Sequence, residues 1–266
     1  MDWSRAKTIL IIVLLLLNIF LLAMNIFRNP ASLFTDNYRK YALDYLSSRD
    51  ISIDIKIPDL SGQAAKIMFT TKEFDPQKLC RIVFGENMPV SFNGDTFDVN
   101  WGEESITLTW DELKITDRLS DGRDLYASPE KFRERVRKYL AEIGYKNVIA
   151  GETGDEDGVI RASFNLEFEK NIVFDHVITA EINSEGLLTV SAPARDISKG
   201  NGKSDILSLY QVLVTGGLSP GTRITDVGFG YKQVSEGDIY GIPVWRVILG
   251  DGTVLYYNAY TGSRLE

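Results

Sequence analysis

The chain begins with an apolar run that contains no charged residue from Thr8 to Phe27. As a helix rising 1.5 Å per residue, a run of roughly 20 residues reaches about 30 Å, the thickness of the hydrocarbon core of a bilayer. A cleaved export signal is shorter and ends in small residues, whereas this run ends in the bulky residues Met24, Ile26 and Phe27. We therefore expect an uncleaved transmembrane helix over residues 8–27.

Helical periodicity returns later in the chain. Residues 35–48 place apolar and aromatic side chains at helical spacing, and a further helix is expected over 205–217. Residues 75–85 begin with Asp75 and Pro76 and end at Gly85, which is typical of a short helix. Residues 128–144 begin with Ser-Pro and end at a glycine. Their apolar stripe comprises Phe132, Val136, Tyr139, Leu140 and Ile143.

Other apolar segments alternate with period two and predict strands. Residues 95–101 and 104–110 predict an antiparallel hairpin, and Asp251-Gly252 predicts a second one. A helix followed by adjacent strands occurs around 128–195 and again around 204–266. We therefore predict an α+β fold with a duplicated helix-plus-antiparallel-sheet unit, not a doubly wound parallel sheet. The other expected strands are 66–70, 158–168, 176–183, 187–194, 223–234, 242–250 and 253–260.

Charges at the start of the chain predict its orientation. Arg5 and Lys7 precede the apolar run, so the positive-inside rule places residues 1–7 in the cytoplasm, with Trp3 near the inner membrane interface. Everything after Arg28 is then extracytoplasmic. The chain is expected to be a single-pass protein of the cell membrane.

The extracytoplasmic part is long enough for two small domains. The segment 118–127 is rich in turn residues and is the expected boundary between domains at 30–122 and 123–266. The second domain would contain both helix–sheet units. With 44% hydrophobic and 25% charged residues, the chain has the composition of a globular protein.

Composition excludes some functions. A net charge of -8 argues against nucleic acid, which binds basic surfaces. Cys80 is the single cysteine, so the chain has no internal disulfide, and its apolar neighbours favour a buried core residue. No cofactor is indicated.

Several short motifs resemble catalytic or ligand-binding sequences. Ser128 and Lys131 match a Ser-x-x-Lys pattern, but the companion motifs are absent or out of order, and a helix cap explains Ser128 better. Residues 202–204 match the end of a phosphate loop, yet the first glycine of that pattern is replaced by Ile197, so a flexible linker is expected.

The acidic residues and the histidine also predict no metal-binding or catalytic site. Asp155 and Asp157 resemble the front of a calcium loop, but the twelfth position is Phe164, so an acidic turn is expected. His176 is the sole histidine and is expected in a strand. The adjacent Glu103 and Glu104 are expected at a turn. We therefore predict that the protein is not an enzyme.

Two amides interrupt the apolar run. Asn18 and Asn25 are seven residues apart and lie on nearly one helix face, which the apolar side chains of Ile11, Leu14, Leu15, Leu21 and Leu22 extend. An amide exposed to hydrocarbon is costly, whereas a hydrogen bond to another transmembrane helix is worth roughly 0.6–2 kcal/mol. We therefore expect this face to bind a partner helix.

The N-terminal residues resemble a known family. Met1 to Ser4, the basic step from Arg5 to Lys7, and Asn18 to Leu21 are similar to the start of the YycI (WalI) family of bacterial regulatory proteins. The predicted architecture of one span and an exterior region resembles that family over the whole length. Residues 259–262 are similar to the end of PepSY-like modules.

The resemblance implies a regulator of the two-component system of the WalK (YycG) histidine kinase and the WalR (YycF) response regulator. In that family, transmembrane helices associate with the kinase, together with those of YycH, and restrain it, which tunes cell-wall metabolism. It also implies an exterior α+β fold related to parts of YycH. The alternative is an anchored extracytoplasmic enzyme or cell-wall ligand-binding module. The sequence leaves open whether the chain forms a homodimer.

The amide pair gives a first prediction. Replacing Asn18→Leu together with Asn25→Leu should weaken recovery of transmembrane partners, because the interhelical hydrogen bonds are lost, while the exterior region stays folded. Affinity purification from membranes, with circular dichroism of the purified variant, measures both. Unchanged recovery of partners would rule out the role assigned to these amides.

Overall fold

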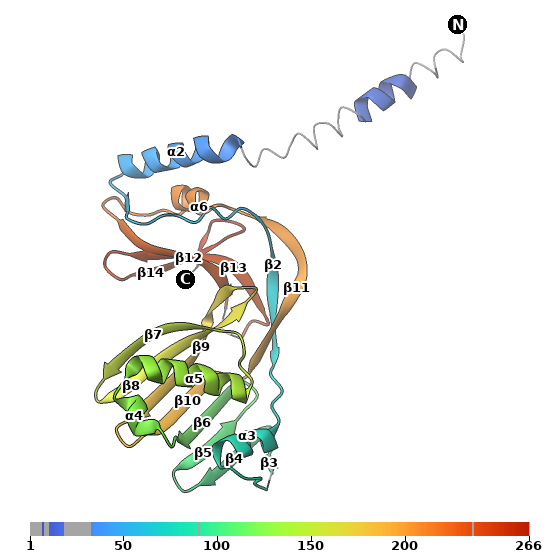
Figure 1. The fold of residues 1–266 in the computed structure, drawn as a ribbon. Helices are drawn as coiled ribbons and strands as arrows, with labels where there is room; N and C mark the ends of the chain where they lie inside the picture. Colours follow the sequence, from blue (N-terminus) through green and yellow to red (C-terminus); the bar gives the residue numbers. More distant parts are fainter. Residues whose placement is uncertain (1–6, 8–10, 19–32, 90, 236, 266) are drawn as a thin grey trace.

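The described chain is an α+β fold built on a mixed β-sheet (Figure 1). The computed structural model describes residues 7, 11–18, 33–89, 91–235 and 237–265. Lys7 and residues 11–18 are helical. The later helices are α2 (Leu33–Ser48), α3 (Pro76–Val83), α4 (Gly122–Tyr126), α5 (Pro129–Ile143) and α6 (Leu209–Thr215).

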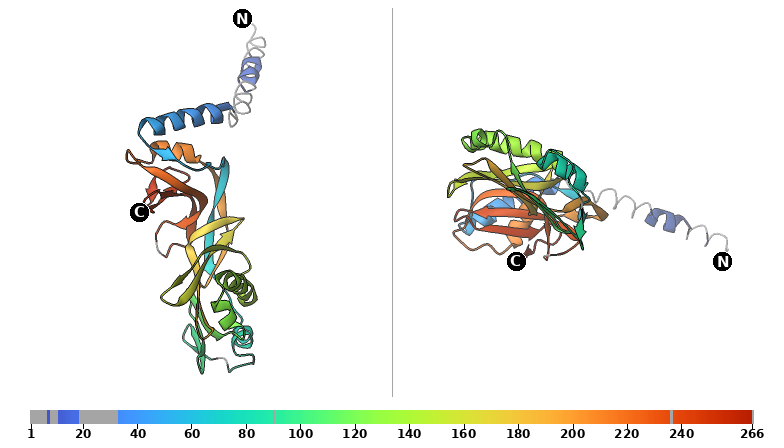
Figure 2. Two further views of the ribbon diagram at one scale, coloured as in Figure 1. Left: turned by 60° about the vertical axis from the view of Figure 1, so that its left-hand side comes forward. Right: turned by 90° about the horizontal axis from the view of Figure 1, so that it is seen from below.

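The strands form one connected sheet along an elongated body (Figures 1 and 2). Most neighbouring strands are antiparallel, as predicted, but β12 runs parallel to both β1 and β9. The strands are β1 (Ser52–Ile53), β2 (Gly62–Thr71), β3 (Phe92–Asn93), β4 (Thr96–Trp101), β5 (Glu104–Leu108), β6 (Glu112–Arg118), β7 (Val148–Glu156), β8 (Val159–Phe168), β9 (Asn171–Asn183), β10 (Leu187–Pro193), β11 (Arg195–Ile206), β12 (Arg223–Gln233), β13 (Tyr240–Leu249), β14 (Val254–Asn258) and β15 (Arg264–Leu265).

Helix ends follow the local signals in the sequence. The Asp75 carboxylate accepts hydrogen bonds from the backbone N–H groups of Gln77 and Lys78, at 3.0 and 3.3 Å, and so caps α3. Gly144 ends α5 in the left-handed conformation, with φ of 114°. Ser128 occupies the N-cap position of α5 as predicted, although its side chain makes no capping hydrogen bond.

A first core lies between the sheet and α3, α4 and α5 (Figure 1). The predicted stripe of α5 is buried along its whole length. Cys80 on α3 is also buried in this core, which confirms the expectation of a buried core residue. Strands β6, β8, β9 and β10 contribute the opposing apolar side chains.

A second core lies beneath α2 and α6, at the other end of the body. Trp245 on β13 is fully buried, and its indole N–H donates to the carbonyl of Leu207 at 2.9 Å. Helix α6 is shorter than the predicted 205–217, because Ser208 and Gln211 form a capping box at its start. The Asp251-Gly252 turn joins β13 and β14 as predicted.

The cores do not follow the domain boundary expected at residue 122. The first core contains Ile67 and Phe69 as well as Tyr231, and the second contains Ala42 as well as Tyr257. The physical reason is strand pairing over long distances: β2 pairs with β11 and β13, and β6 pairs with β10. The expected boundary segment instead contains α4, which packs against α5 and β9.

Two segments expected to be turns or linkers are strands. Residues 196–204 belong to β11, which pairs with β2 with a shift of register between Lys199 and Lys203. Residues 151–156 belong to β7, so the acidic turn is confined to Asp157 and Gly158. In both cases the partner strand supplies the hydrogen bonds, and a bulge interrupts the alternation that would mark a strand.

The two parts of the sheet meet where β9 runs beside β12. Their parallel ladder pairs Gly230 with Ile172 and Tyr231 with Val173. Beyond it, the Asp175 carboxylate accepts the backbone N–H of Gln233 at 2.5 Å and contacts His176 Nδ1 at 3.1 Å. Burial alone would raise the pKa of Asp175, but these two contacts hold the pKa below its usual value.

Gly230 gives a direct test of this contact. A Cβ added there would lie 2.3 Å from the Ile172 carbonyl oxygen and 2.6 Å from the Phe174 ring. Gly230→Ala should therefore lower the free energy of unfolding by about 1–3 kcal/mol, measured by denaturant titration. At Gly228, the nearest atoms to an added Cβ are 3.8 Å away, so Gly228→Ala is the matched control and should be neutral or slightly stabilising. Equal effects of the two substitutions would contradict the close approach.

Candidate functional site

The N-terminal helical segment presents an uncovered apolar surface. Every side chain from Ile11 to Leu17 is more than half exposed, so no described part of the protein covers them. Ile11, Leu14 and Asn18 lie at i, i+3 and i+7, on one face of the helix. The Asn18 side-chain amide donates to the Leu14 carbonyl at 2.9 Å, which occupies one of its two N–H groups. Seven adjacent apolar side chains in water are unfavourable and need a covering partner.

Much of the expected membrane segment lies outside the described residues. These undescribed positions include Trp3 and Arg5 as well as Leu21, Leu22 and Asn25. Within the parts of the chain that the structure describes, no helix has both the length and the apolar character required to cross a membrane. The span over 8–27 thus stays a prediction.

The motifs that resemble catalytic sequences lie apart from one another. Ser128 starts α5, whereas Lys203, which was expected in a linker, pairs with Ala65 in the β11–β2 ladder. His176 is buried on β9 and its ring stacks on Phe69, with centroids 4.2 Å apart. Among the described residues, no three His, Cys, Asp or Glu side chains are grouped so that they could hold a metal ion.

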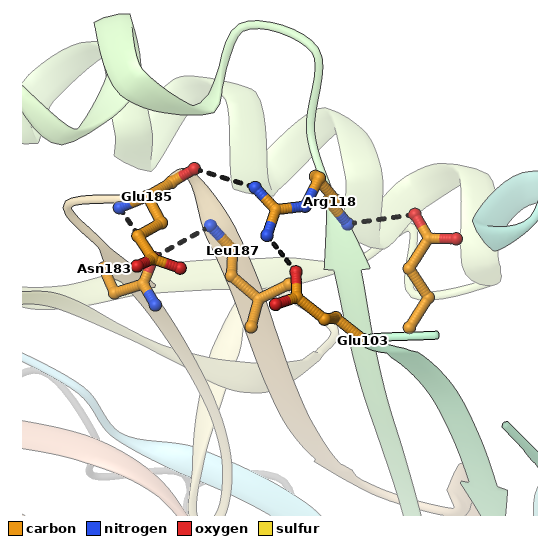
Figure 3. A network of polar contacts seen from close by, with 6 residues as sticks. Glu103, Arg118, Asn183, Glu185 and Leu187 are labelled. Atoms are coloured by element: carbon orange, nitrogen blue, oxygen red, sulfur yellow. Dashed lines mark hydrogen bonds and ion pairs between the residues drawn. The ribbon is translucent and has the colours of Figure 1, made fainter. Parts of the chain in front are cut away.

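A polar cluster surrounds Arg118 at the end of β6 (Figure 3). The guanidinium pairs with the Glu103 carboxylate and donates to the Glu185 carbonyl at 3.2 Å. The Arg118 backbone N–H donates to Glu104 Oε1 at 3.3 Å. Neighbouring Asn183 accepts the backbone N–H groups of Glu185 and Leu187, both at 3.0 Å. The adjacent glutamates thus lie at the β4–β5 turn, as expected, and both bind Arg118.

This cluster borders a cavity of about 590 Å³ between α4 and the β9–β10 turn. Gly122 and Gly186 pack closely beside this cavity, because a Cβ added at Gly122 would lie 2.3 Å from the Gly186 carbonyl oxygen. The hydrogen bond and the opposite charge of Glu103 raise the pKa of Arg118. Since the guanidinium joins the β4–β5 turn, β6 and the β9–β10 turn, its arrangement is that of a structural junction. The lining residues are Arg118, Leu119, Ser120, Asp121, Arg123, Asp124 and Glu185.

Beside Arg118, the carboxyl group of Asp117 is buried against α5. Burial raises the pKa of Asp117 to about 6, an effect that the Tyr139 hydroxyl and the Arg135 guanidinium partly offset and that the charge of Glu104 increases. The Tyr139 hydroxyl is itself buried beside this carboxyl group. Asp117 is thus a buried group that titrates close to neutral pH.

Sequence reasoning missed Asp117, although the signal was present. In β6, Leu113 and Ile115 face the first core, and period-two alternation places Asp117 on the same face. The contacts of Arg118 had no such signal, because Glu103 and Glu185 are 15 and 67 residues away in the chain.

Comparison with known structures yields distant likenesses. No family model matches the chain, and no curated protein matches it. The structure is similar to that of an uncharacterized protein from Eubacterium rectale ATCC 33656, with 13% identity, a TM-score of 0.49 and coverage of 82% of this chain and 91% of that one. It is also similar to the Bacillus megaterium YpeB C-terminal domain, with 10% identity, a TM-score of 0.46 and coverage of 73% and 97%, respectively. The resemblance to the YycI family stays a prediction.

Asp117 generates a prediction about pH. The folded protein holds the Asp117 proton up to about pH 6, while the unfolded chain releases it near the ordinary value of 3.8. Between these values the native state binds more protons, so the contribution of Asp117 to the free energy of unfolding falls as pH rises, by about 3 kcal/mol in total. Asp117→Asn should remove this fall.

Denaturant titrations from pH 4 to pH 7 measure the effect as a difference from the wild type. The stability of Asp117→Asn relative to the wild type should increase over this range. Parallel pH profiles for Asp117→Asn and the wild type would contradict the burial effect.

Proposed function

We propose that the protein is a membrane-anchored, non-enzymatic regulator of the YycI family. In this proposal, the N-terminus is cytoplasmic, residues 8–27 cross the bacterial cell membrane once, and the bulk of the chain is extracytoplasmic. Together with YycH, the protein binds the WalK (YycG) sensor histidine kinase through transmembrane helix contacts. It thereby restrains the kinase and tunes cell-wall metabolism.

The observation that carries the proposal is the exposure of residues 11–17. Seven consecutive large apolar side chains, each more than half exposed, lack a cover within the described protein. A lipid bilayer or a partner helix would cover these side chains. The resemblance of the first residues to the YycI family supports the choice of partner.

Asn18 supports a role beyond anchoring. Its bond to the Leu14 carbonyl keeps the amide on the face that also carries Ile11. One N–H group and the amide oxygen can then meet a polar group on a neighbouring helix, which would favour one register of association. Residues 1–7, which carry the basic residues Arg5 and Lys7, are expected to anchor the N-terminus on the cytoplasmic side.

The proposal includes a duplicated extracytoplasmic fold. Helix α5 is followed by the antiparallel strands β7 to β10, and α6 is followed by β12 to β14. Both helices cover one face of the strands that follow them. This repeated order supports two related helix–sheet units. The two units meet where β9 pairs with β12, and they join the rest of the sheet where β10 pairs with β6 and β13 pairs with β2.

The test is recovery of partners from native membranes. Full-length protein is compared with a variant whose residues 8–27 are rearranged into a different order of the same amino acids. Such a variant anchors equally well but lacks the face formed by Ile11, Leu14 and Asn18. We expect the wild type to recover a histidine kinase and a second single-span protein, identified by mass spectrometry, and the rearranged variant to lose both.

The opposite result would be recovery that depends on the exterior region alone. If the partners, or fragments of cell wall, are recovered equally with either span, the regulator proposal fails. An anchored enzyme or ligand-binding module would then be the better explanation. Membrane fractionation of both variants is the control that they insert equally.

A further inference from the structure

Strand β11 contains a bulge that the sequence pattern did not reveal. Its ladder with β2 passes from Lys199, paired with Ile67, to Lys203, paired with Ala65, so residues 200–202 lie opposite Lys66. A Cβ at Gly200 would lie 2.8 Å from the Lys66 carbonyl oxygen, so only glycine lets the bulge lie this close to β2. The bulge displaces the backbone N–H groups of residues 200–202 from the regular ladder.

A cavity of about 270 Å³ opens beside this bulge. Its residues come from three strands, because Tyr240 at the start of β13 pairs with Met68 on β2. The volume lies just below the range of roughly 300–1,000 Å³ that is usual for small-ligand pockets. The lining residues are Lys66, Met68, Lys199, Gly200, Asn201 and Tyr240.

The charged groups at the cavity are basic in a protein of net charge -8. Lys66 and Lys199 are both exposed, and the Lys199 ammonium forms an ion pair with Glu169 at 3.4 Å. The Asn201 amide adds a neutral donor. Ammonium and amide groups with displaced backbone N–H groups are the donors that bind phosphate or carboxylate oxygens.

An apolar wall completes the cavity. The Tyr240 side chain is 46% exposed although it adjoins buried strands, and Ile239 before it is 59% exposed. Met68 lies beside Tyr240 on the paired strand. A phenol ring and a thioether at the surface suit a flat or apolar ligand body, which an inorganic anion does not have.

We propose that this cavity binds an organic anion, in which a phosphate or carboxylate group is attached to a flat or apolar body. Lys66, Lys199 and the bulge hold the anionic group, while Tyr240 and Met68 contact the body. The site lies on the extracytoplasmic region of the proposed topology, but the inference rests on the cavity and does not depend on the regulator proposal.

The test uses phenyl phosphate as the probe and the full chain in neutral detergent micelles. Binding is followed by ³¹P line broadening, with protein-free micelles as the blank. Lys66→Gln combined with Lys199→Gln should raise the dissociation constant by about tenfold or more, because hydrogen bonds to charged groups are lost. Lys203→Gln is the matched control, since Lys203 borders the bulge without lining the cavity, and it should bind like the wild type.

A second comparison tests the apolar wall. The wild type should bind phenyl phosphate more tightly than inorganic phosphate, and Tyr240→Ala should remove this difference. The proposal is overturned if the double lysine variant binds as well as the wild type, or if Lys203→Gln weakens binding equally, since either result means general attraction to surface charge. Equal affinity of the wild type for both phosphates would overturn the assignment of an organic ligand.

Discussion

The close approach of β9 and β12 at Gly230 is the constraint that joins the strands around the first core and those around the second core into one sheet. The parallel ladder there involves only two residue pairs, so each must fit well. Because Gly230 has no side chain, the Ile172 carbonyl and the Phe174 ring can lie against the backbone of β12. Where the strands diverge, Asp175 supplies the acceptor that Gln233 would otherwise lack. This pairing joins the strands of the first core to those of the second.

Those elements that depend on neighbouring residues were predictable from the sequence. Helix α3 has its cap at Asp75, α5 has its stop at Gly144, and β13 turns into β14 at Asp251-Gly252, all through contacts within a few residues. Elements that depend on a distant partner were not predictable. Strand β11 resembles a Gly/Lys/Ser linker until β2 pairs with it. Pairing across the expected domain boundary had no local signal for the same reason, because β2, from the first expected domain, lies between β11 and β13 of the second.

The functional residues show the same difference between local signals and contacts with distant parts of the chain. Burial of Asp117 follows from alternation in β6 and could have been inferred, whereas the cavity beside Lys66 requires a bulge whose position only the register of two strands reveals. The N-terminal segment is the opposite case. Its apolar pattern and its amides are explicit in the sequence, and its folded surroundings add that no described residue covers Ile11 to Leu17. Hydrophobic patterning is thus most informative for a segment that no described part of the chain covers, and least informative for a strand whose partner is distant in the sequence.

Under the proposed function, the position of the cavity bears on how the folded region could influence the N-terminal helix. Strand β2 starts beside the second core, which α2 covers, and ends at the first core, and the cavity lies on its pairing with β11 and β13. A ligand bound there contacts the strands that link the two cores. It can alter the N-terminal helix only if it binds more tightly to one arrangement of those strands than to another. The bulge at residues 200–202 could differ between such arrangements, because its backbone lies outside the regular ladder of β2 and β11.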